Sequence, residues 1–318
     1  MKRLLCALCV LLLLSGCTSS VPAQETTLTI TATTYPLYLF ALDLTEGIPN
    51  VTVERLDTGS VSCLHDYTLS VNDMKKIERA DVLALNGAGL EAFMSDALAD
   101  TDAVVIDCSK GVDLLPATGH HDHDHGDDDH DHFDPHYWMD PLRAQIMVDN
   151  LRVGLSEVLP EHRDLLWENA VGNTLDTAYY TAHNALRIFE EEKISVPGLI
   201  TFHDGFQYFA NTLDLPLLRA IEEEAGSEAS AKEIVDIARL VNELDIPVIF
   251  TEVNGSDATA NAISRETDCS VVQLSMIMDG REPTEEDDSP TTPYEELFLN
   301  NVYTLINGFA GREVFTLP

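Results

Sequence analysis

Residues 161–193 read EHRDLLWENAVGNTLDTAYYTAHNALRIFEEEK, and this stretch separates two halves of similar pattern. It contains no proline and one glycine, Gly172. Its apolar residues recur at steps of three to five, which places them on one face of a helix. A single helix of this length spans about 50 Å. We therefore expect one long rigid helix that joins two domains.

Strands alternate with helices on both sides of this stretch. Before it, strands are predicted at 28–33, 51–56, 81–85 and 103–107, with helices from 35 onward and at 72–79, 89–98 and 140–159. After it, strands are predicted at 199–202, 217–220, 248–251 and 271–274, with helices at 204–211, 230–244, 258–266 and 293–310. This alternation predicts parallel sheets covered on both faces. We expect an α/β fold with an N-terminal domain at 28–160, a linking helix at 161–193 and a C-terminal domain at 194–318. A ligand is expected in the cleft between the domains.

The N-terminus has the features of an export signal. Lys2 and Arg3 precede an apolar run at residues 4–14, which is too short for a membrane-spanning helix of about 20 residues. The run ends in Leu-Ser-Gly-Cys, the pattern that bacterial lipoprotein signal peptidase requires before a lipidated cysteine. Residues 1–16 are therefore predicted to be removed, Cys17 to carry lipid, and residues 17–27 to form a tether. A plain secretory signal is the alternative, and it also exports the chain.

The composition narrows the class of partner. The formal net charge is −37, which excludes nucleic acid as a partner and favours cations near the surface. Three cysteines remain beyond Cys17, at positions 63, 108 and 269, too few and too widely spaced for a disulfide framework. They are compatible either with one disulfide bridge and one free thiol, or with three buried thiols.

Six of the 11 histidines lie within residues 119–132, where they alternate with aspartate. This segment has no apolar residue, so it cannot fold by burial. Neutral imidazole suits zinc, copper and nickel, and the aspartates add oxygen donors. The segment therefore indicates metal handling rather than one defined site, and a solvated acidic loop is the alternative. Its histidines are His120, His121, His123, His125, His130 and His132.

Three further histidines stand at the boundaries of predicted elements. His65 follows the second predicted strand, and His136 lies between the two Asp-Pro steps of Asp-Pro-His-Tyr-Trp-Met-Asp-Pro. His203 follows the strand at 199–202, where an α/β crevice places its ligands. Two of these residues belong to the first half and one to the second, so they can converge on one ion between the domains.

The phrases around these three histidines carry a family resemblance. His-Asp-Tyr at 65–67, the Asp-Pro phrase at 134–141 and Phe-His-Asp-Gly-Phe-Gln-Tyr-Phe at 202–209 resemble the zinc and manganese solute-binding lipoproteins of bacterial ABC transporters. Their order, the lipidation signal, the histidine-rich loop and the long helix match that family over nearly the whole mature chain. The stretch at 228–232 and the strand ending in Thr251-Glu252 also match.

The resemblance implies that His65, His136 and His203 bind one metal ion between the domains. Three imidazoles favour zinc, with manganese the less favoured ion. The family often supplies an aspartate as fourth ligand, but Ser275 occupies that position here. Asp279 is our first candidate for the fourth ligand, and Glu252 or water are the alternatives.

The expected function is capture of zinc outside the cytoplasm and its delivery to an ABC permease, by a monomer without enzymatic activity. A lipid-anchored zinc hydrolase is one alternative, with Glu252 or Asp66 as general base, but the chain has no HExxH pair. A surface adhesin or metal buffer that acts through residues 119–132 is another. In that case, deletion of the loop removes nearly all zinc binding.

Overall fold

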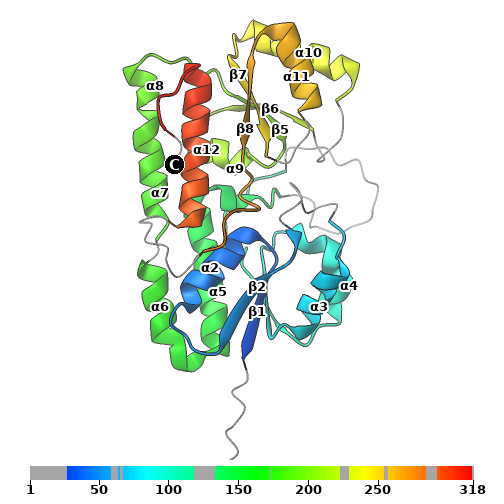
Figure 1. Ribbon diagram of the computed structural model, residues 1–318, viewed down its shortest axis with the longest axis vertical. Coiled ribbons are helices and arrows are strands. Elements are labelled where there is room, and N and C mark those ends of the chain that lie inside the picture. Colours follow the sequence, from blue (N-terminus) through cyan, green and yellow to red (C-terminus); the bar gives the residue numbers. More distant parts are fainter. Residues whose placement is uncertain are drawn as a thin grey trace, which may run out of the picture.

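The computed structural model describes residues 27–58, 64, 67–117, 133–172, 174–222, 229–253, 257–283 and 292–316. Its core consists of two four-stranded parallel sheets, one in each half of the chain (Figure 1). The first sheet has the order β2-β1-β3-β4 and the second the order β6-β5-β7-β8. The strands are β1 (Leu28–Ala32), β2 (Val51–Arg55), β3 (Val82–Leu85), β4 (Val104–Asp107), β5 (Leu199–His203), β6 (Leu217–Glu222), β7 (Val248–Glu252) and β8 (Ser270–Leu274).

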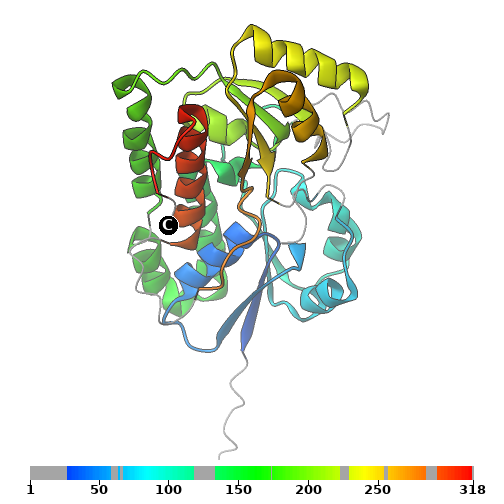
Figure 2. The same cartoon turned by 45° about the horizontal axis from the view of Figure 1, so that its top comes forward.

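Helices cover both sheets on both sides. One group covers the face of each sheet that lies away from α12 (Figure 2). It consists of α3 (Val71–Arg79), α4 (Ser95–Ala99), α10 (Ala231–Glu243) and α11 (Ala258–Thr267). A second group contains α2 (Tyr35–Thr45), α5 (Pro141–Val158), α6 (Arg163–Gly172), α7 (Asp176–Leu186), α8 (Ile188–Glu191), α9 (Gln207–Thr212) and α12 (Pro293–Ala310). Short 3₁₀ helices are η2 (Leu90–Met94), η3 (Tyr137–Met139) and η4 (Pro160–His162). No helix in the described ranges has both the length and the apolar character needed to cross a membrane.

Local sequence explains where several helices begin. Ser70, Ser230 and Thr292 each accept a hydrogen bond from the backbone amide three residues on, and the acidic side chain there accepts one in return. These reciprocal capping boxes satisfy amide groups that a helix start leaves without partners. They fix the first turns of α3, α10 and α12.

The expectation of one rigid helix at 161–193 is wrong. The chain forms η4, α6, α7 and α8 in this range, and α6 and α7 are separated between Gly172 and Asp176. Gly172 is a poor helix former, and the amide of Leu175 is bound by the Oε1 atom of Gln145 on α5 at 3.0 Å instead of by its own helix. The segments still follow one another along one side of the molecule, where α7 packs against α12 and α6 against α2 and α5 (Figure 1). The link between the halves is therefore a segmented column held by its neighbours.

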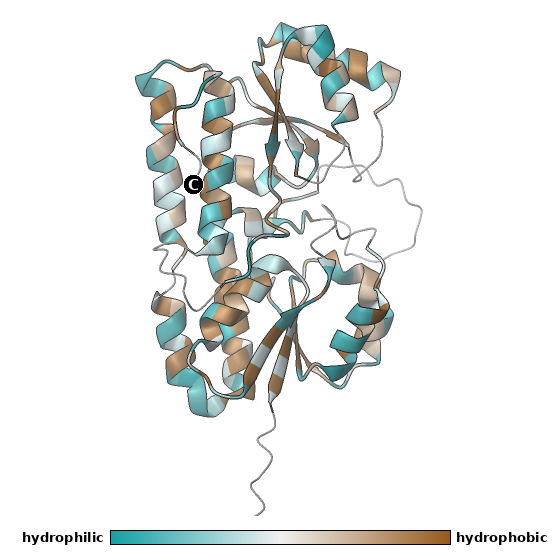
Figure 3. Ribbon diagram, in the orientation of Figure 1, coloured by the Kyte–Doolittle hydropathy of each residue, from teal (hydrophilic) through white to brown (hydrophobic). Residues whose placement is uncertain are grey.

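The hydrophobic core is shared between the two halves. Its main cluster contains Ile30 and Val82 of the first sheet, Phe250 of the second, and Leu305 and Phe309 of α12. Two smaller clusters lie under the outer helices, one for each sheet. Figure 3 shows hydrophobic residues along the strands of both sheets, with helices of mixed character around them. Both faces of each sheet are therefore covered, as the strand-helix alternation predicts.

Candidate metal site

His136 and His203 meet where the two halves face each other. Their Nε2 atoms lie 3.4 Å apart, and their rings are nearly perpendicular at 88°. Both residues are buried, with exposed fractions of 3% and 2%. Two nitrogen ligands of a tetrahedral zinc ion, each about 2.0–2.1 Å from the metal, lie about 3.3–3.4 Å from each other. The spacing of these two nitrogens therefore fits a shared zinc ion.

Asp134 orients the imidazole of His136. Its Oδ1 atom lies 2.7 Å from His136 Nδ1 and also accepts a hydrogen bond from the His136 amide at 2.9 Å. Because a carboxylate accepts hydrogen bonds, Nδ1 carries the proton and the Nε2 lone pair of the neutral ring is available for a cation. The loop is held from the other half of the chain, since Tyr208 donates to the Asp134 carbonyl at 2.7 Å and Gln207 donates to Oδ2 at 3.2 Å.

A buried network supports the same loop from the first sheet. Asn86 donates a side-chain hydrogen bond to the Pro135 carbonyl at 3.1 Å, and Tyr137 donates to the Asn86 carbonyl at 2.5 Å. The Glu91 carboxylate accepts from the amides of Asn86 and Gly87 and from the hydroxyl of Thr33. Burial raises the pKa of Glu91 to about 7, against the lowering effect of these bonds. Sequence patterns gave no sign of this network.

His203 is placed by the sheet itself. It is the last residue of β5, and Glu252 is the last residue of the neighbouring strand β7. The Oε1 atom of Glu252 lies 3.8 Å from His203 Nδ1 and is buried with it. This distance is too long for a hydrogen bond, although it is close enough for electrostatic attraction. Each histidine thus has a carboxylate on its Nδ1 side, while the two Nε2 atoms face each other.

Asp279, the predicted fourth ligand, is turned to other partners and not to this pair. The Asp279 side chain is 52% exposed, and its Oδ1 atom accepts hydrogen bonds from Arg55 Nη2 at 2.9 Å and from the Gly280 amide at 2.9 Å. Within the described ranges, no group of three or more histidine, cysteine, aspartate or glutamate side chains is arranged to hold a metal. The described part of the site therefore consists of two histidines and the carboxylates beside them.

Several predictions concern residues outside the described ranges. His65 is one of them, but Thr58 before it and Tyr67 after it are fixed by hydrogen bonds to the Thr33 carbonyl and to Asp73. Cys17 and the six histidines between 120 and 132 are also outside these ranges. The flanks of that loop meet in a bridge between Pro116 and Phe133, next to the loop that carries His136. Cys108 and Cys269 are buried free thiols, so they form no bridge with each other.

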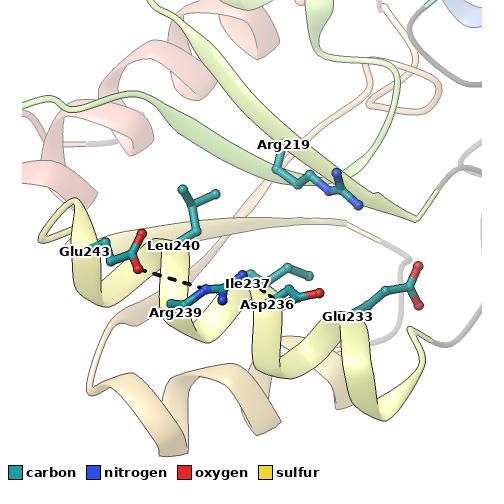
Figure 4. Close-up of a pocket in the computed structure, with 7 residues that line it drawn as sticks. All are labelled: Arg219, Glu233, Asp236, Ile237, Arg239, Leu240 and Glu243. Carbon is teal, nitrogen blue, oxygen red and sulfur yellow. Dashed lines mark hydrogen bonds and ion pairs between the residues drawn. The ribbon is translucent and has the colours of Figure 1, made fainter.

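A hollow of about 300 Å³ lies elsewhere, between β6 and α10 (Figure 4). Arg239 pairs with two of its acidic side chains, at 3.0 Å from Asp236 and 3.9 Å from Glu243. The hollow contains no histidine and is not part of the metal site. Its lining residues are Arg219, Glu233, Asp236, Ile237, Arg239, Leu240 and Glu243.

Comparison with known proteins finds relatives over most of the chain. A family model described as periplasmic component A of the zinc-uptake complex (ZnuA) matches residues 30–308. The zinc-binding lipoprotein AdcA of Streptococcus pneumoniae serotype 4 is 29% identical over 311 residues, which cover 95% of this chain and 59% of AdcA. The manganese-binding lipoprotein MntA of Bacillus subtilis is 26% identical over 255 residues, covering 76% and 77%. This chain thus spans about three fifths of the length of AdcA.

The fold is shared with solved structures. A crystal structure of ZnuA superposes with a TM-score of 0.74 at 21% identity, covering 89% of this chain and 99% of that chain. The two-domain α/β architecture expected from the sequence is therefore confirmed, apart from the interrupted helix.

Proposed function

We propose that this chain, which belongs to the family of periplasmic component A of zinc-uptake complexes, captures zinc outside the cytoplasm and delivers it to an ABC permease. The observation that carries the proposal is the 3.4 Å separation of the Nε2 atoms of His136 and His203. Zinc is the cargo, and no catalytic step is involved. AdcA and MntA are named for zinc and manganese respectively, so the relatives alone leave both ions open.

Zinc is favoured over manganese by the donor atoms. We propose His65, His136 and His203 as the three protein ligands, with the neutral Nε2 atoms of the latter two bound to the ion. Imidazole suits zinc, whereas manganese prefers carboxylate and carbonyl oxygens. The carboxylates of Asp134 and Glu252 lie on the Nδ1 sides of the rings, where they orient the ligands rather than bind the metal.

Water is our proposal for the fourth position, in place of Asp279. The Asp279 carboxylate is half-exposed and pairs with Arg55, whereas His136 and His203 are buried. Affinity is expected to fall as the pH drops through the histidine range near about 6.5, because protons compete with zinc for imidazole.

The remaining parts of the chain suit a receptor at the membrane surface. We propose that lipid on Cys17 anchors the protein and that residues 17–27 tether it. The acidic surface, with its net charge of −37, attracts cations from solution. The loop at 119–132 collects zinc close to the site, since its flanks lie beside the His136 loop. A monomer suffices for this role.

Zinc titration of ligand variants tests the proposal. Competition with a chromophoric chelator should show that His136→Ala and His203→Ala each weaken zinc binding by more than about 100-fold. This loss is larger than the roughly 10–100-fold loss that is expected when a group that only orients a ligand is removed. Asp279→Asn is the matched control and should change affinity less than twofold, within about 0.4 kcal/mol. A deletion of residues 119–132 should retain the tight site. Loss of tight binding in that deletion, with both histidine variants unaffected, would contradict the proposal and favour a loop-based metal buffer.

A further inference from the structure

The side chains of Met276 and His203 both border the open space beside Gly205. A Cβ atom placed on Gly205 would lie 2.4 Å from Met276 Cε and 3.0 Å from His203 Nε2. Met276 Cε is therefore no more than 5.4 Å from Nε2, the sum of these two distances. Gly205 leaves room for this contact, because any larger residue would displace the methionine or the imidazole. Met276 is buried, so its thioether is turned into the protein beside the site.

The backbone around Met276 is held firmly. Trp138 donates from Nε1 to the Met276 carbonyl at 2.9 Å, and the Trp138 ring lies 5.2 Å from the ring of His136. Asn301 on α12 binds both the amide and the carbonyl of Ser275, at 2.8 and 2.7 Å. Contacts from α12 and from the His136 loop thus fix the residue between them.

Backbone strain at the next residue marks the same segment. Ile277 has a φ of 57°, which is rare for a β-branched residue and costs about 1–3 kcal/mol. Its amide is bound by Ser275 Oγ at 3.0 Å. Strain of this kind persists only where the surroundings impose it, and here the backbone bonds of Ser275 and Met276 to Asn301 and Trp138 lie directly before Ile277.

We infer that this cleft also binds the soft cation Cu(I), with the Met276 thioether as a ligand beside the imidazoles of His136 and His203. The inference rests on the proposed function for the two histidine ligands. Thioether sulfur selects Cu(I), whereas zinc is bound by imidazole, thiolate and carboxylate. Met276 should therefore matter for Cu(I) and be nearly indifferent for zinc. No redox step is involved, since the ion binds and leaves as Cu(I).

Paired affinity measurements test this inference. Because thiols also bind Cu(I), all proteins carry Cys6→Ser, Cys9→Ser, Cys17→Ser and Cys63→Ser in the full chain, which leaves the buried Cys108 and Cys269. Cu(I) is supplied without oxygen in competition with a chromophoric Cu(I) chelator. Met276→Leu keeps the volume of the side chain and removes the sulfur. It should weaken Cu(I) binding by about tenfold or more, as expected for loss of a metal-supporting group, while zinc affinity stays within twofold. Met278→Leu, a second buried methionine two residues on, is the control and should change neither affinity.

X-ray absorption at the copper edge gives an independent readout. The protein with Met276 should show a sulfur neighbour of copper that Met276→Leu lacks. Equal Cu(I) affinities, or an unchanged sulfur signal, overturn the inference while zinc binding through the histidines still supports the proposed function. Parallel loss of zinc and Cu(I) in Met276→Leu also overturns it, because the residue then acts by packing. Methionine-dependent Cu(I) binding without any zinc binding supports the inference and overturns the proposed function.

Discussion

The two histidines of the site are supported to different degrees. His136 has a carboxylate at 2.7 Å from Nδ1, and that carboxylate accepts a hydrogen bond from the side chain of Gln207 on α9. His203 has a carboxylate only at 3.8 Å, and its Nδ1 atom makes no hydrogen bond to any part of the chain that the structure describes. His136 is thus fixed before a metal arrives, whereas His203 can still adjust. The difference indicates that one ligand provides affinity through preorganisation and the other accommodates the ion.

Removal of the Asp134 carboxylate, which holds His136, should have the largest effect on zinc affinity. Asp134→Ala should weaken zinc binding by about 100-fold, the upper end of the range for orienting partners of metal ligands. The reason is that His136 loses both the tautomer and the ring orientation that Asp134 imposes. Chelator competition measures the affinity, and circular dichroism checks that the variant is folded. A change of less than threefold would contradict the preorganised role.

Removal of the Glu252 charge, which lies further from its histidine, should have a smaller effect on zinc affinity. Glu252→Gln should weaken zinc binding by about tenfold, the lower end of the same range, because the amide keeps the shape and removes the charge near His203. The two variants are compared in one chelator titration. If Glu252→Gln costs as much as Asp134→Ala or more, the ranking of the two supports is wrong and Glu252 is a candidate ligand.

Substitution of Glu91, in the buried network that supports the His136 loop, should affect the stability of the protein more than its zinc affinity. The pKa of Glu91 is raised to about 7 in the folded protein, from 4.5 when unperturbed, so the folded state keeps a proton that the unfolded chain loses. Stability of the metal-free protein should therefore fall as the pH rises from about 4.5 to 7. Glu91→Gln should remove this part of the slope and change zinc affinity less than about twofold, since Glu91 contacts neither histidine.

Urea-induced unfolding of the metal-free protein at pH 5, 6 and 7.5 measures the effect of Glu91. An identical slope in the wild-type chain and in Glu91→Gln would show that Glu91 is not the group responsible. Asp43, whose pKa burial raises to about 6, contributes in the same direction in both proteins and so cancels in the comparison.

Much of the fold follows from the sequence because parallel strands are buried apolar runs and their helices carry clear start signals. The helix expected at 293–310 has those bounds in the structure, where a capping box and a proline mark its start. The helix expected at 161–193 is interrupted, and at the interruption Gln145, on a different helix, binds the amide of Leu175. Apolar periodicity carries no information about such a tertiary contact.

The metal site likewise has features that the sequence predicts and features that it does not. Sequence motifs predict that His136 and His203 converge, and the structure places their Nε2 atoms 3.4 Å apart. The same motifs do not predict that Asp279 turns to Arg55 or that Met276 lies near His203, because both depend on how the chain crosses between the halves after β8. An aspartate two residues before His136 was the available signal for the orienting carboxylate.

The core shared by both halves has a consequence for the order of folding during synthesis. Helix α12 packs against α2 and α7 as well as β8, so residues near the C-terminus complete a core that begins at Ile30. A ribosome adds about 5–20 residues per second, starting from the N-terminus. The first half therefore waits, with apolar surface uncovered, until the last helix has been made, and a chain cut short before residue 293 leaves the largest core cluster without its α12 side chains.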